Sequence, residues 1–591
     1  MSPQKILLKI ALLLPFGCLG QFYMKGRIVD DKNLILANVK MRLFSNGMLY
    51  TNGASGEFGL PSSRKADTII CFAEGYDSLK TVLNYSDYNT IVLKPTSFTK
   101  EERENHLSAL TPSLSKDPSY LHYISDESYS NMVENAFVDA EKFPVTGFSL
   151  NINKASYSNV RRYINNQTMP PADAVRIEEM LNYFSLCFAP KPADGEVFGM
   201  NTQLSGCPWD TSHLLLFIGA RARKINLENV PQGNLVFLID NSGSMDMPNR
   251  LPLLKAGFKM LVNNLRDKDT VTIVSYGGTA SLLLSPTGGA EKQKIIDAIE
   301  GLSPAGETPG SSGLKLAYQM AQSKFVKDGN NRVILATDGD FNVGQINDKE
   351  LESLIKNYRN SGIYLTCLGV GMGNYKDSKL ETLARYGNGN FAYLDNEAEA
   401  EKVLVKEFAQ TVLPVASNVS LNLNFINSPL VKQYRLIGFD NRQDALYDSS
   451  AQLEGGEIGS GHNMIAMAEI VPNKNINDWK TGINQMLGKI ELKYQLPGSN
   501  DINYVVKNIP ADYKSFTDLD STLRFATSVA MFGTFAKHSK FAQHYNFDTI
   551  YNIAATSVTQ GDLVQQEYLL LLQKAKELYT PKSIKKKRKE K

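Results

Sequence analysis

The sequence predicts a multidomain protein with a doubly wound, Rossmann-like α/β domain at its centre, a β-sandwich before it, and a β-rich plus helical domain after it. From about 230 to 412, apolar strands alternate with amphipathic helices, the pattern of a mostly parallel sheet covered on both faces. From 21 to 95, short alternating runs are separated by Asn-Gly and Ser-Gly turns, which is typical of an antiparallel β-sandwich. From 413 to 578, strand-like runs return and a helical segment follows.

Residues 1–20 predict a secretory signal peptide. Lys5 and Lys9 precede an apolar core that is too short to cross a bilayer as a mature helix, and we expect cleavage before Gln21. Cys18 is also a candidate lipid-attachment site. No later segment reaches transmembrane length. We therefore expect an exported protein of the periplasm or the cell surface, soluble or lipid-anchored, without a transmembrane span.

The predicted β-sandwich carries three glycine motifs, namely Gly26 to Asp30, Gly56 to Phe58, and Gly75-Tyr76. Together they resemble the carboxypeptidase regulatory-like module, and this resemblance implies a fold but no peptidase activity. The polar, charge-rich stretch from 96 to 140 predicts a linker. From 141 to 229 we expect a further segment, with two helices around a turn at Pro170-Pro171.

The central region from 230 to 412 begins with the apolar strand 234–239 and continues as alternating strands and helices. The other expected strands are 270–276, 281–285, 332–337, 363–370 and 390–394, and the expected helices are 251–265, 292–302, 312–325, 349–362, 378–387 and 397–412. In sheets of this kind, ligands bind beyond the carboxyl ends of the strands, where the strand order reverses. The loops that follow the strands are therefore the place to look for a site.

Composition narrows the function classes. The formal net charge is only +2, so nothing indicates a nucleic-acid partner, and the basic tail from 579 to 591 is typical of a solvated end, with attachment to an anionic surface as the alternative. Cys71 and Cys367 lie in expected core strands, whereas Cys187 and Cys207 are candidates for a disulfide that the sequence does not decide. The chain has no CxxC and no HExxH motif, so zinc is not expected.

Oxygen-bearing side chains occur at three places on the expected site edge. Asp240, Ser242 and Ser244 follow the first central strand in a DxSxS pattern, Thr308 lies in AGETPGSSG, and Asp338 ends the strand in RVILATDGD. Carboxylates and hydroxyls are hard donors that suit Mg²⁺, Mn²⁺ or Ca²⁺. DxSxS alone would more simply cap the following helix. The combination with the two distant places favours a divalent metal site.

This combination resembles the metal-ion-dependent adhesion site of von Willebrand factor type A domains, the fold shared with integrin inserted domains. The resemblance implies direct metal contacts from Ser242, Ser244 and Thr308, and contacts from Asp240 and Asp338 that are direct or through water. It also implies that a carboxylate from a protein partner completes the metal shell. Mg²⁺ takes about six ligands and usually keeps waters, so an acidic side chain can replace one of them.

Several longer motifs are similar to a bacterial family of exported proteins in which a type A domain lies between a specific N-terminal segment and a C-terminal domain. The similarity covers about 130 to 575 and depends on FSLNINKASYSNVRRYINN, PADAVRIEEMLNYF, NRVILATDGDFNVG, YRLIGFDNR and GEIGSGH. The family tends to carry acidic residues where this chain has Asn151 and Asn153. The resemblance implies the architecture more than a mechanism.

The function expected from these features is metal-dependent protein–protein interaction in the cell envelope, without enzymatic activity. One alternative is a Mg²⁺-dependent hydrolase that uses Asp240 as its nucleophile. Such enzymes generally need a second carboxylate two residues later for acid–base work, and that position is Ser242 here. The other alternative is a scaffold whose metal only stabilises the fold.

Overall fold

The computed structural model describes two main stretches of the chain, 22–94 and 127–580. Within them it leaves out 32, 46–47, 54, 74–75, 151–152, 227–229, 278, 305, 307–309, 328, 340–347, 373–374, 409, 411–412, 440–454, 476–477 and 480–484. The signal peptide, Cys18, Thr308, Asn151, most of the expected linker and nearly all of the basic tail lie outside the described residues. The chain divides into two compact units, 1–125 and 126–591. In the described part of the chain, no helix is long and apolar enough to cross a membrane.

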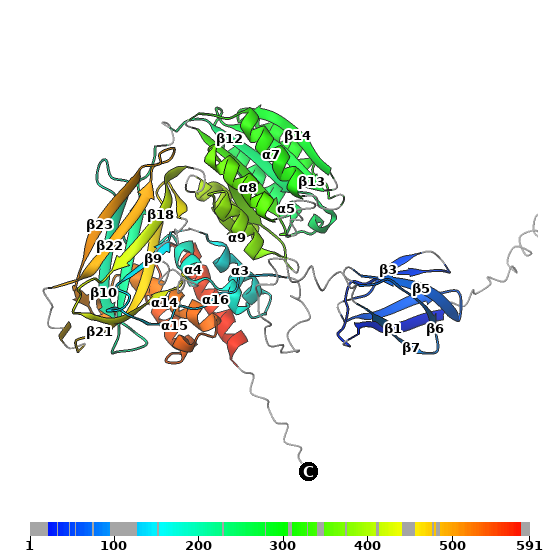
Figure 1. Cartoon of the computed structure of the whole chain (residues 1–591), viewed down its shortest axis with the longest axis horizontal. Helices are drawn as coiled ribbons and strands as arrows, with labels where there is room; N and C mark the ends of the chain where they lie inside the picture. The colour runs from blue at the N-terminus through cyan, green and yellow to red at the C-terminus, as the bar shows by residue number, and fades with distance from the viewer. Residues whose placement is uncertain are drawn as a thin grey trace, which may run out of the picture. The chain divides into compact units, whose positions relative to one another are not determined.

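The first unit is a β-sandwich, as predicted (Figure 1). Its strands are β1 (Phe22–Asp30), β2 (Lys40–Leu43), β3 (Leu49–Thr51), β4 (Glu57–Ser62), β5 (Ala66–Phe72), β6 (Leu79–Asn84) and β7 (Tyr88–Leu93). They form two sheets in the orders β4-β1-β7 and β3-β2-β5-β6; the predicted antiparallel pairing is wrong for β1 and β7, which are parallel. Alternate side chains such as Met24 and Ile28 on one sheet and Met41 and Ile69 on the other share a buried core. The resemblance of this unit to the carboxypeptidase regulatory-like module stays a prediction.

The second unit contains the predicted doubly wound domain, drawn in green in Figure 1. Its sheet has the order β14-β13-β12-β15-β16-β17, and every neighbouring pair is parallel except β13 with β14. The strands are β12 (Gly233–Asp240), β13 (Thr270–Gly277), β14 (Thr279–Gly288), β15 (Asn330–Thr337), β16 (Ile363–Gly369) and β17 (Phe391–Tyr393).

Helices cover both faces of this sheet because its strands are apolar on both sides. Leu235, Phe237 and Ile239 of β12 pack against the helices of one face, and Val236 and Leu238 pack against those of the other. The first face carries α5 (Leu251–Asn263), α6 (Lys292–Glu300) and α10 (Glu397–Glu401), which continues as a π-helical turn over Lys402–Lys406. The second face carries α7 (Gly310–Ser323), α8 (Asp348–Asn360) and α9 (Asp377–Tyr386).

The segments before and after the central domain form a single host domain. The predicted boundaries treat 141–229 and 413–578 as separate parts, but β11 pairs with β21 along eight residues, and β9 pairs with β18. The two host sheets have the orders β24-β10-β11-β21-β19-β8 and β20-β18-β22-β23. The strands are β8 (Val138–Asp139), β9 (Val145–Ser149), β10 (Phe198–Gly206), β11 (Leu214–Ala222), β18 (Pro414–Asn424), β19 (Val431–Ile437), β20 (Gly456–Gly459), β21 (Asn463–Pro472), β22 (Met486–Gln495), β23 (Ile502–Pro510) and β24 (Tyr513–Lys514). The central domain is thus inserted between β11 and β18.

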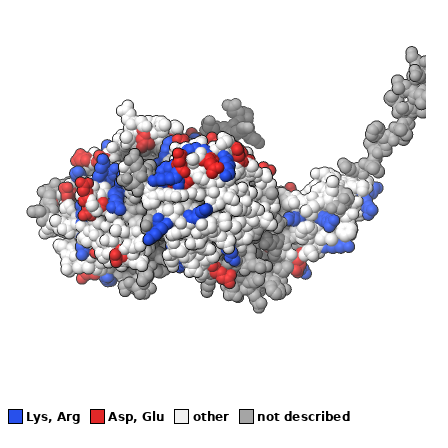
Figure 2. Space-filling model, turned by 90° about the horizontal axis from the view of Figure 1, so that it is seen from above, with Lys and Arg blue, Asp and Glu red and all other residues white. Residues whose placement is uncertain are grey.

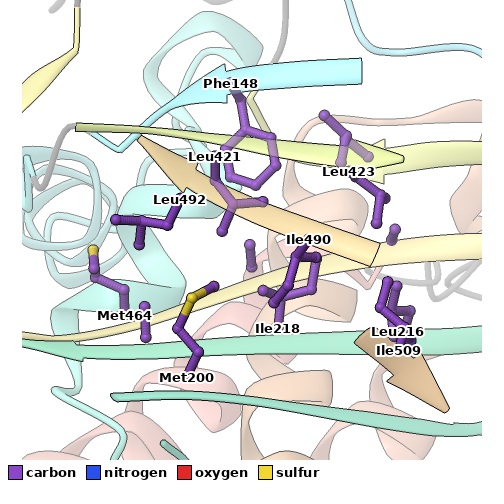
Figure 3. Close-up of a cluster of buried hydrophobic side chains, with 14 of the residues drawn as sticks. Phe148, Met200, Leu216, Ile218, Leu421, Leu423, Met464, Ile490, Leu492 and Ile509 are labelled. Atoms are coloured by element: carbon purple, nitrogen blue, oxygen red, sulfur yellow. The ribbon is translucent and has the colours of Figure 1, made fainter. Parts of the chain in front are cut away.

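Figure 3 shows the core that unites the two halves of the host domain. Met200 and Ile218 come from strands before the insertion, and Leu421, Ile490 and Ile509 come from strands after it. Sequence periodicity identifies such strands one at a time but carries no information on their partners, so the shared core was not predicted.

Helices pack on the other face of the β11 and β21 sheet. Leu215 and Phe217 of β11 point to this face, opposite to Leu216 and Ile218. The helices are α3 (Ala155–Asn165), α4 (Ile177–Tyr183), α14 (Ser521–Ala536), α15 (Phe547–Ala555) and α16 (Leu563–Tyr579). The two helices expected around Pro170-Pro171 are α3 and α4.

Buried ion pairs join the host to the central domain. Arg161 of α3 contacts Asp395 at 2.5 Å and Glu399 at 2.7 Å, and these side chains are at most 4% exposed. Arg332 of β15 contacts Glu457 of β20 at 2.8 Å. The described end of the expected linker also packs on this unit, since Ser128 forms a bridge with Lys376 and β8 pairs with β19.

The four cysteines in the described part of the chain, Cys71, Cys187, Cys207 and Cys367, are free. The candidate disulfide between Cys187 and Cys207 is therefore not formed. Cys187 is exposed, whereas Cys207 is buried. Figure 2 shows basic and acidic side chains interspersed on the face of the molecule in view, in keeping with the small net charge.

A charged cluster connects β19 and β21 with the turn between β10 and β11. His213 follows the turn after β10, and its Nδ1 lies 2.6 Å from Oε1 of Glu469 on β21. Arg435 of β19 reaches Oε2 of the same carboxylate at 2.7 Å. Burial opposes protonation of His213, but the hydrogen bond and negative charge of Glu469 raise its pKa above the ordinary value. Burial likewise opposes ionisation of Glu469, yet His213 and Arg435 hold its pKa below the usual range.

This cluster predicts a loss of stability toward alkaline pH. The stabilisation from protonated His213 is fully present below about pH 6.5, and it is lost as the pH rises through the raised pKa of the folded state. The free energy of unfolding should therefore fall by on the order of 1 kcal/mol between about pH 6 and about pH 9. Urea unfolding at several pH values measures this. His213→Gln should flatten the decline and exposed His538→Asn should keep it, so equal declines in all three proteins would contradict the prediction.

Candidate metal site

The carboxyl ends of β12 and β15 lie side by side. The two strands are parallel neighbours in register from Gly233 with Asn330 to Ile239 with Ala336. Asp240 is the last residue of β12, and Asp338 directly follows β15. Both carboxylates are fully buried. The sheet topology therefore brings together two acidic residues that are almost one hundred positions apart in the sequence.

The loop after β12 folds back over Asp240. The backbone N–H of Ser242 donates to Oδ1 of Asp240 at 2.9 Å, and the Thr337 hydroxyl donates to Oδ2 at 2.8 Å. The hydroxyl oxygens of Ser242 and Ser244 lie 3.1 Å apart. The Gly243 N–H donates to the carbonyl oxygen of Gly306 at 3.1 Å. Thus three of the predicted ligands gather at one strand end.

Burial sets the electrostatics of these carboxylates. Desolvation raises the pKa of Asp240 to about 6, and the charge of Asp338 acts in the same direction, while the hydrogen bonds from Ser242 and Thr337 oppose the shift. Two buried carboxylates at one edge of the sheet are costly without a nearby cation. The site therefore favours a positively charged group beside them.

Arg250 supplies one such charge, and sequence reasoning missed it. Its Nη1 donates to Oδ2 of Asp338 at 2.6 Å and to the carbonyl oxygen of Ser244 at 2.7 Å, and its Nη2 donates to the carbonyl oxygen of Met372 at 2.8 Å. Arg250 is the N-cap residue of α5. A cation at a helix N-terminus is unfavourable because it opposes the helix dipole. An arginine at this position is therefore unusual, and this was the sequence signal that could have pointed to a role for Arg250.

The donor set fits a hard divalent cation. Asp240, Ser242, Ser244 and Asp338 offer carboxylate and hydroxyl oxygens, the chemistry that Mg²⁺, Mn²⁺ and Ca²⁺ take. Over the residues that the structure describes, no group of three or more His, Cys, Asp and Glu side chains forms a separate metal cluster. Thr308 lies outside those residues. The metal assignment of all five residues stays a prediction.

Three family models match the second unit. The model described as von Willebrand factor matches 123–217, the von Willebrand factor type A domain model matches 234–407, and the model described as the C-terminal part of YfbK matches 410–578. The first and third matches cover parts of the host domain, and the second match covers the central domain inserted between them.

Individual known proteins are also similar to this chain. The chain is 40% identical over 352 residues to YfbK of Escherichia coli (strain K12), a match that covers 58% of this chain and 61% of YfbK. It is 24% identical to sll0103 of Synechocystis over 52% of this chain and 71% of that protein. A solved von Willebrand factor type A protein from Catenulispora acidiphila matches 65% of this chain and 90% of that structure at 15% identity and a TM-score of 0.37. The chain thus spans about three-fifths of the length of YfbK.

Proposed function

Because the chain contains a von Willebrand factor type A domain and a C-terminal part like that of YfbK, to which it is 40% identical over 352 residues, we propose that it is a divalent-metal-dependent protein–protein interaction module. The partner would offer an acidic side chain that completes the metal shell. The signal peptide expected from the sequence supports a location in the cell envelope.

The observation that carries this proposal is the juxtaposition of Asp240, Ser242 and Ser244 with Asp338 on neighbouring strand ends. Two carboxylates neutralise a divalent ion, whereas the neutral serine hydroxyls add ligands without adding charge. A cation held in this way retains positions for water, and an incoming carboxylate can take one of them. A hydrolase that uses Asp240 has less support, because the serine at position 242 bonds Ser244 and is no second carboxylate.

Metal binding tests the first half of the proposal. The wild type should bind one Mg²⁺ in a calorimetric titration, and Asp240→Ala should abolish that binding because it removes a buried carboxylate of the site. Asp297→Ala is a matched control, since Asp297 lies on α6 and pairs with Gln293 at 2.7 Å. Circular dichroism would show that both variants are folded. Unchanged Mg²⁺ affinity in Asp240→Ala would refute the metal assignment.

Partner capture tests the second half. Envelope extract passed over the immobilised protein in Mg²⁺ should yield proteins that are lost in EDTA and lost with Asp240→Ala, but kept with Asp297→Ala. If the captured proteins are the same under all four conditions, metal-dependent interaction is wrong. A lower melting temperature of Asp240→Ala with unchanged capture would instead support the scaffold alternative.

A further inference from the structure

We propose that Arg250 is a fixed counter-charge of the metal site: it holds the site together without metal, weakens cation binding, and gives the loaded site a net positive charge that selects an anionic group. This inference rests on the proposed metal-dependent function. It concerns a residue outside the five predicted ligands.

Arg250 connects three loops that the sheet brings to one edge. Its guanidinium donates to Asp338 after β15, to the Ser244 carbonyl after β12, and to the Met372 carbonyl after β16. All three contacts are between 2.6 and 2.8 Å, and the residue is only 9% exposed. A charge-assisted bond to a buried carboxylate is stronger than one between neutral groups. The guanidinium is therefore a structural part of the site.

The fold makes room for this side chain at Gly371. The backbone of Gly371 has a φ of +78°, and a Cβ atom built there would lie 2.5 Å from Nε of Arg250. A larger residue would thus be strained and would also displace the guanidinium. A glycine at this position keeps a slot that fits Arg250.

The formal charges of these side chains determine how tightly the site binds a cation and whether the loaded site attracts an anion. Asp240 and Asp338 with Arg250 carry a formal net charge of −1, and a divalent ion changes this to +1. Without the arginine, the same two states would have charges of −2 and zero. In a buried site these charges are screened far less than at the surface. Arg250 should therefore lower the affinity of the site for a divalent cation. It should also leave the metal-loaded site with one excess positive charge, which a bound carboxylate would neutralise.

Neutral variants of Arg250 test the inference by metal binding alone. Mg²⁺ titrated into Arg250→Met should bind at least tenfold more tightly than into the wild type, because one nearby positive charge is gone. The metal-free melting temperature should fall, because the buried Asp338 carboxylate loses the charged hydrogen bond from Arg250. Arg250→Gln provides the same charge change with a polar side chain, should the methionine variant fail to fold. Arg250→Lys should stay within about threefold of the wild type, since it keeps the charge.

Arg266→Met is the matched control. Arg266 also pairs with an aspartate, Asp269 at 2.6 Å, but it lies near the start of β12 and bonds the Val230 carbonyl at 3.1 Å. Its loss should leave Mg²⁺ affinity unchanged. Equal or weaker Mg²⁺ binding by Arg250→Met and Arg250→Gln would overturn the inference. Absence of Mg²⁺ binding by the wild type would instead overturn the proposed function itself.

A separate measurement tests whether Arg250 makes the metal-loaded site prefer an anionic ligand. Trifluoroacetate is a carboxylate probe whose ¹⁹F signal broadens on binding. In saturating Mg²⁺ the signal should broaden with the wild type and with Arg266→Met, and at least tenfold less with Arg250→Met, although that variant holds the metal more tightly. Equal broadening by all three proteins would show that Arg250 does not select the anion.

Discussion

Replacing Glu457 with alanine should lower the free energy of unfolding of the second unit by about 3–5 kcal/mol. The variant leaves Arg332 in the central domain without its carboxylate partner 2.8 Å away. The two side chains are 0% and 2% exposed, so water cannot replace the lost partner. Arg332 would keep its bonds to the Thr366 hydroxyl at 2.9 Å and to Oδ1 of Asn330 at 3.5 Å, but neither group carries a charge. An uncompensated buried guanidinium is among the most costly defects that a single substitution can produce.

Denaturant unfolding of the full chain measures this effect, and a double variant identifies its cause. Arg332→Met with Glu457→Leu removes both charges and should recover most of the lost stability. The control is Glu401→Ala, which breaks an ion pair with Lys406 whose side chains are 45% and 64% exposed. It should cost less than about 1 kcal/mol. If the double variant is no more stable than Glu457→Ala, the buried charge is not the cause.

Gly26→Ala should destabilise the first unit by about 3 kcal/mol, through crowding rather than through lost contacts. A Cβ atom at position 26 would lie 1.9 Å from the carbonyl oxygen of Asn89, which belongs to the partner strand β7. The carbonyl is part of the backbone, so it can move only if β1 and β7 separate. Such a shift would break the parallel pair that joins the two strands.

Calorimetry of the full chain can check this prediction because the two units are separate compact bodies. The transition of the first unit should fall by roughly 10–20 °C, given the steep dependence of melting temperature on stability in small domains. The transition of the second unit should not move. Gly53→Ala is the control, since its Cβ would meet nothing within 4 Å. Similar behaviour of the two alanine variants would argue against the close approach.

The sequence was most informative where a pattern is local. The helical segment expected late in 413–578 includes the helix Leu563–Tyr579, and the first central strand, expected over 234–239, is Gly233–Asp240. The helix shows apolar periodicity and the strand is a continuous apolar run, and both patterns can be recognised without a distant partner. The α/β class of the central domain follows from several such elements in alternation, and it is confirmed by the parallel sheet.

Features that depend on distant partners were not predicted. The strand β11 joins the second half of the host domain through its pairing with β21, which lies on the other side of the insertion. At the metal site, side chains on strand ends could be predicted because parallel strands share an edge. Arg250 could not, because nothing in its spacing shows that a helix-end guanidinium turns toward Asp338.

The inserted arrangement also has a consequence for how the chain is made. A ribosome releases β11, which ends at Ala222, long before β21, which begins at Asn463. In the interval the hairpin of β10 and β11 has apolar side chains on both faces and no sheet to join. The central domain, whose strands are all local to 233–393, can complete its own sheet first. Newly synthesised chains should thus pass through a state in which the central domain is native while the host strands around it still need protection from aggregation.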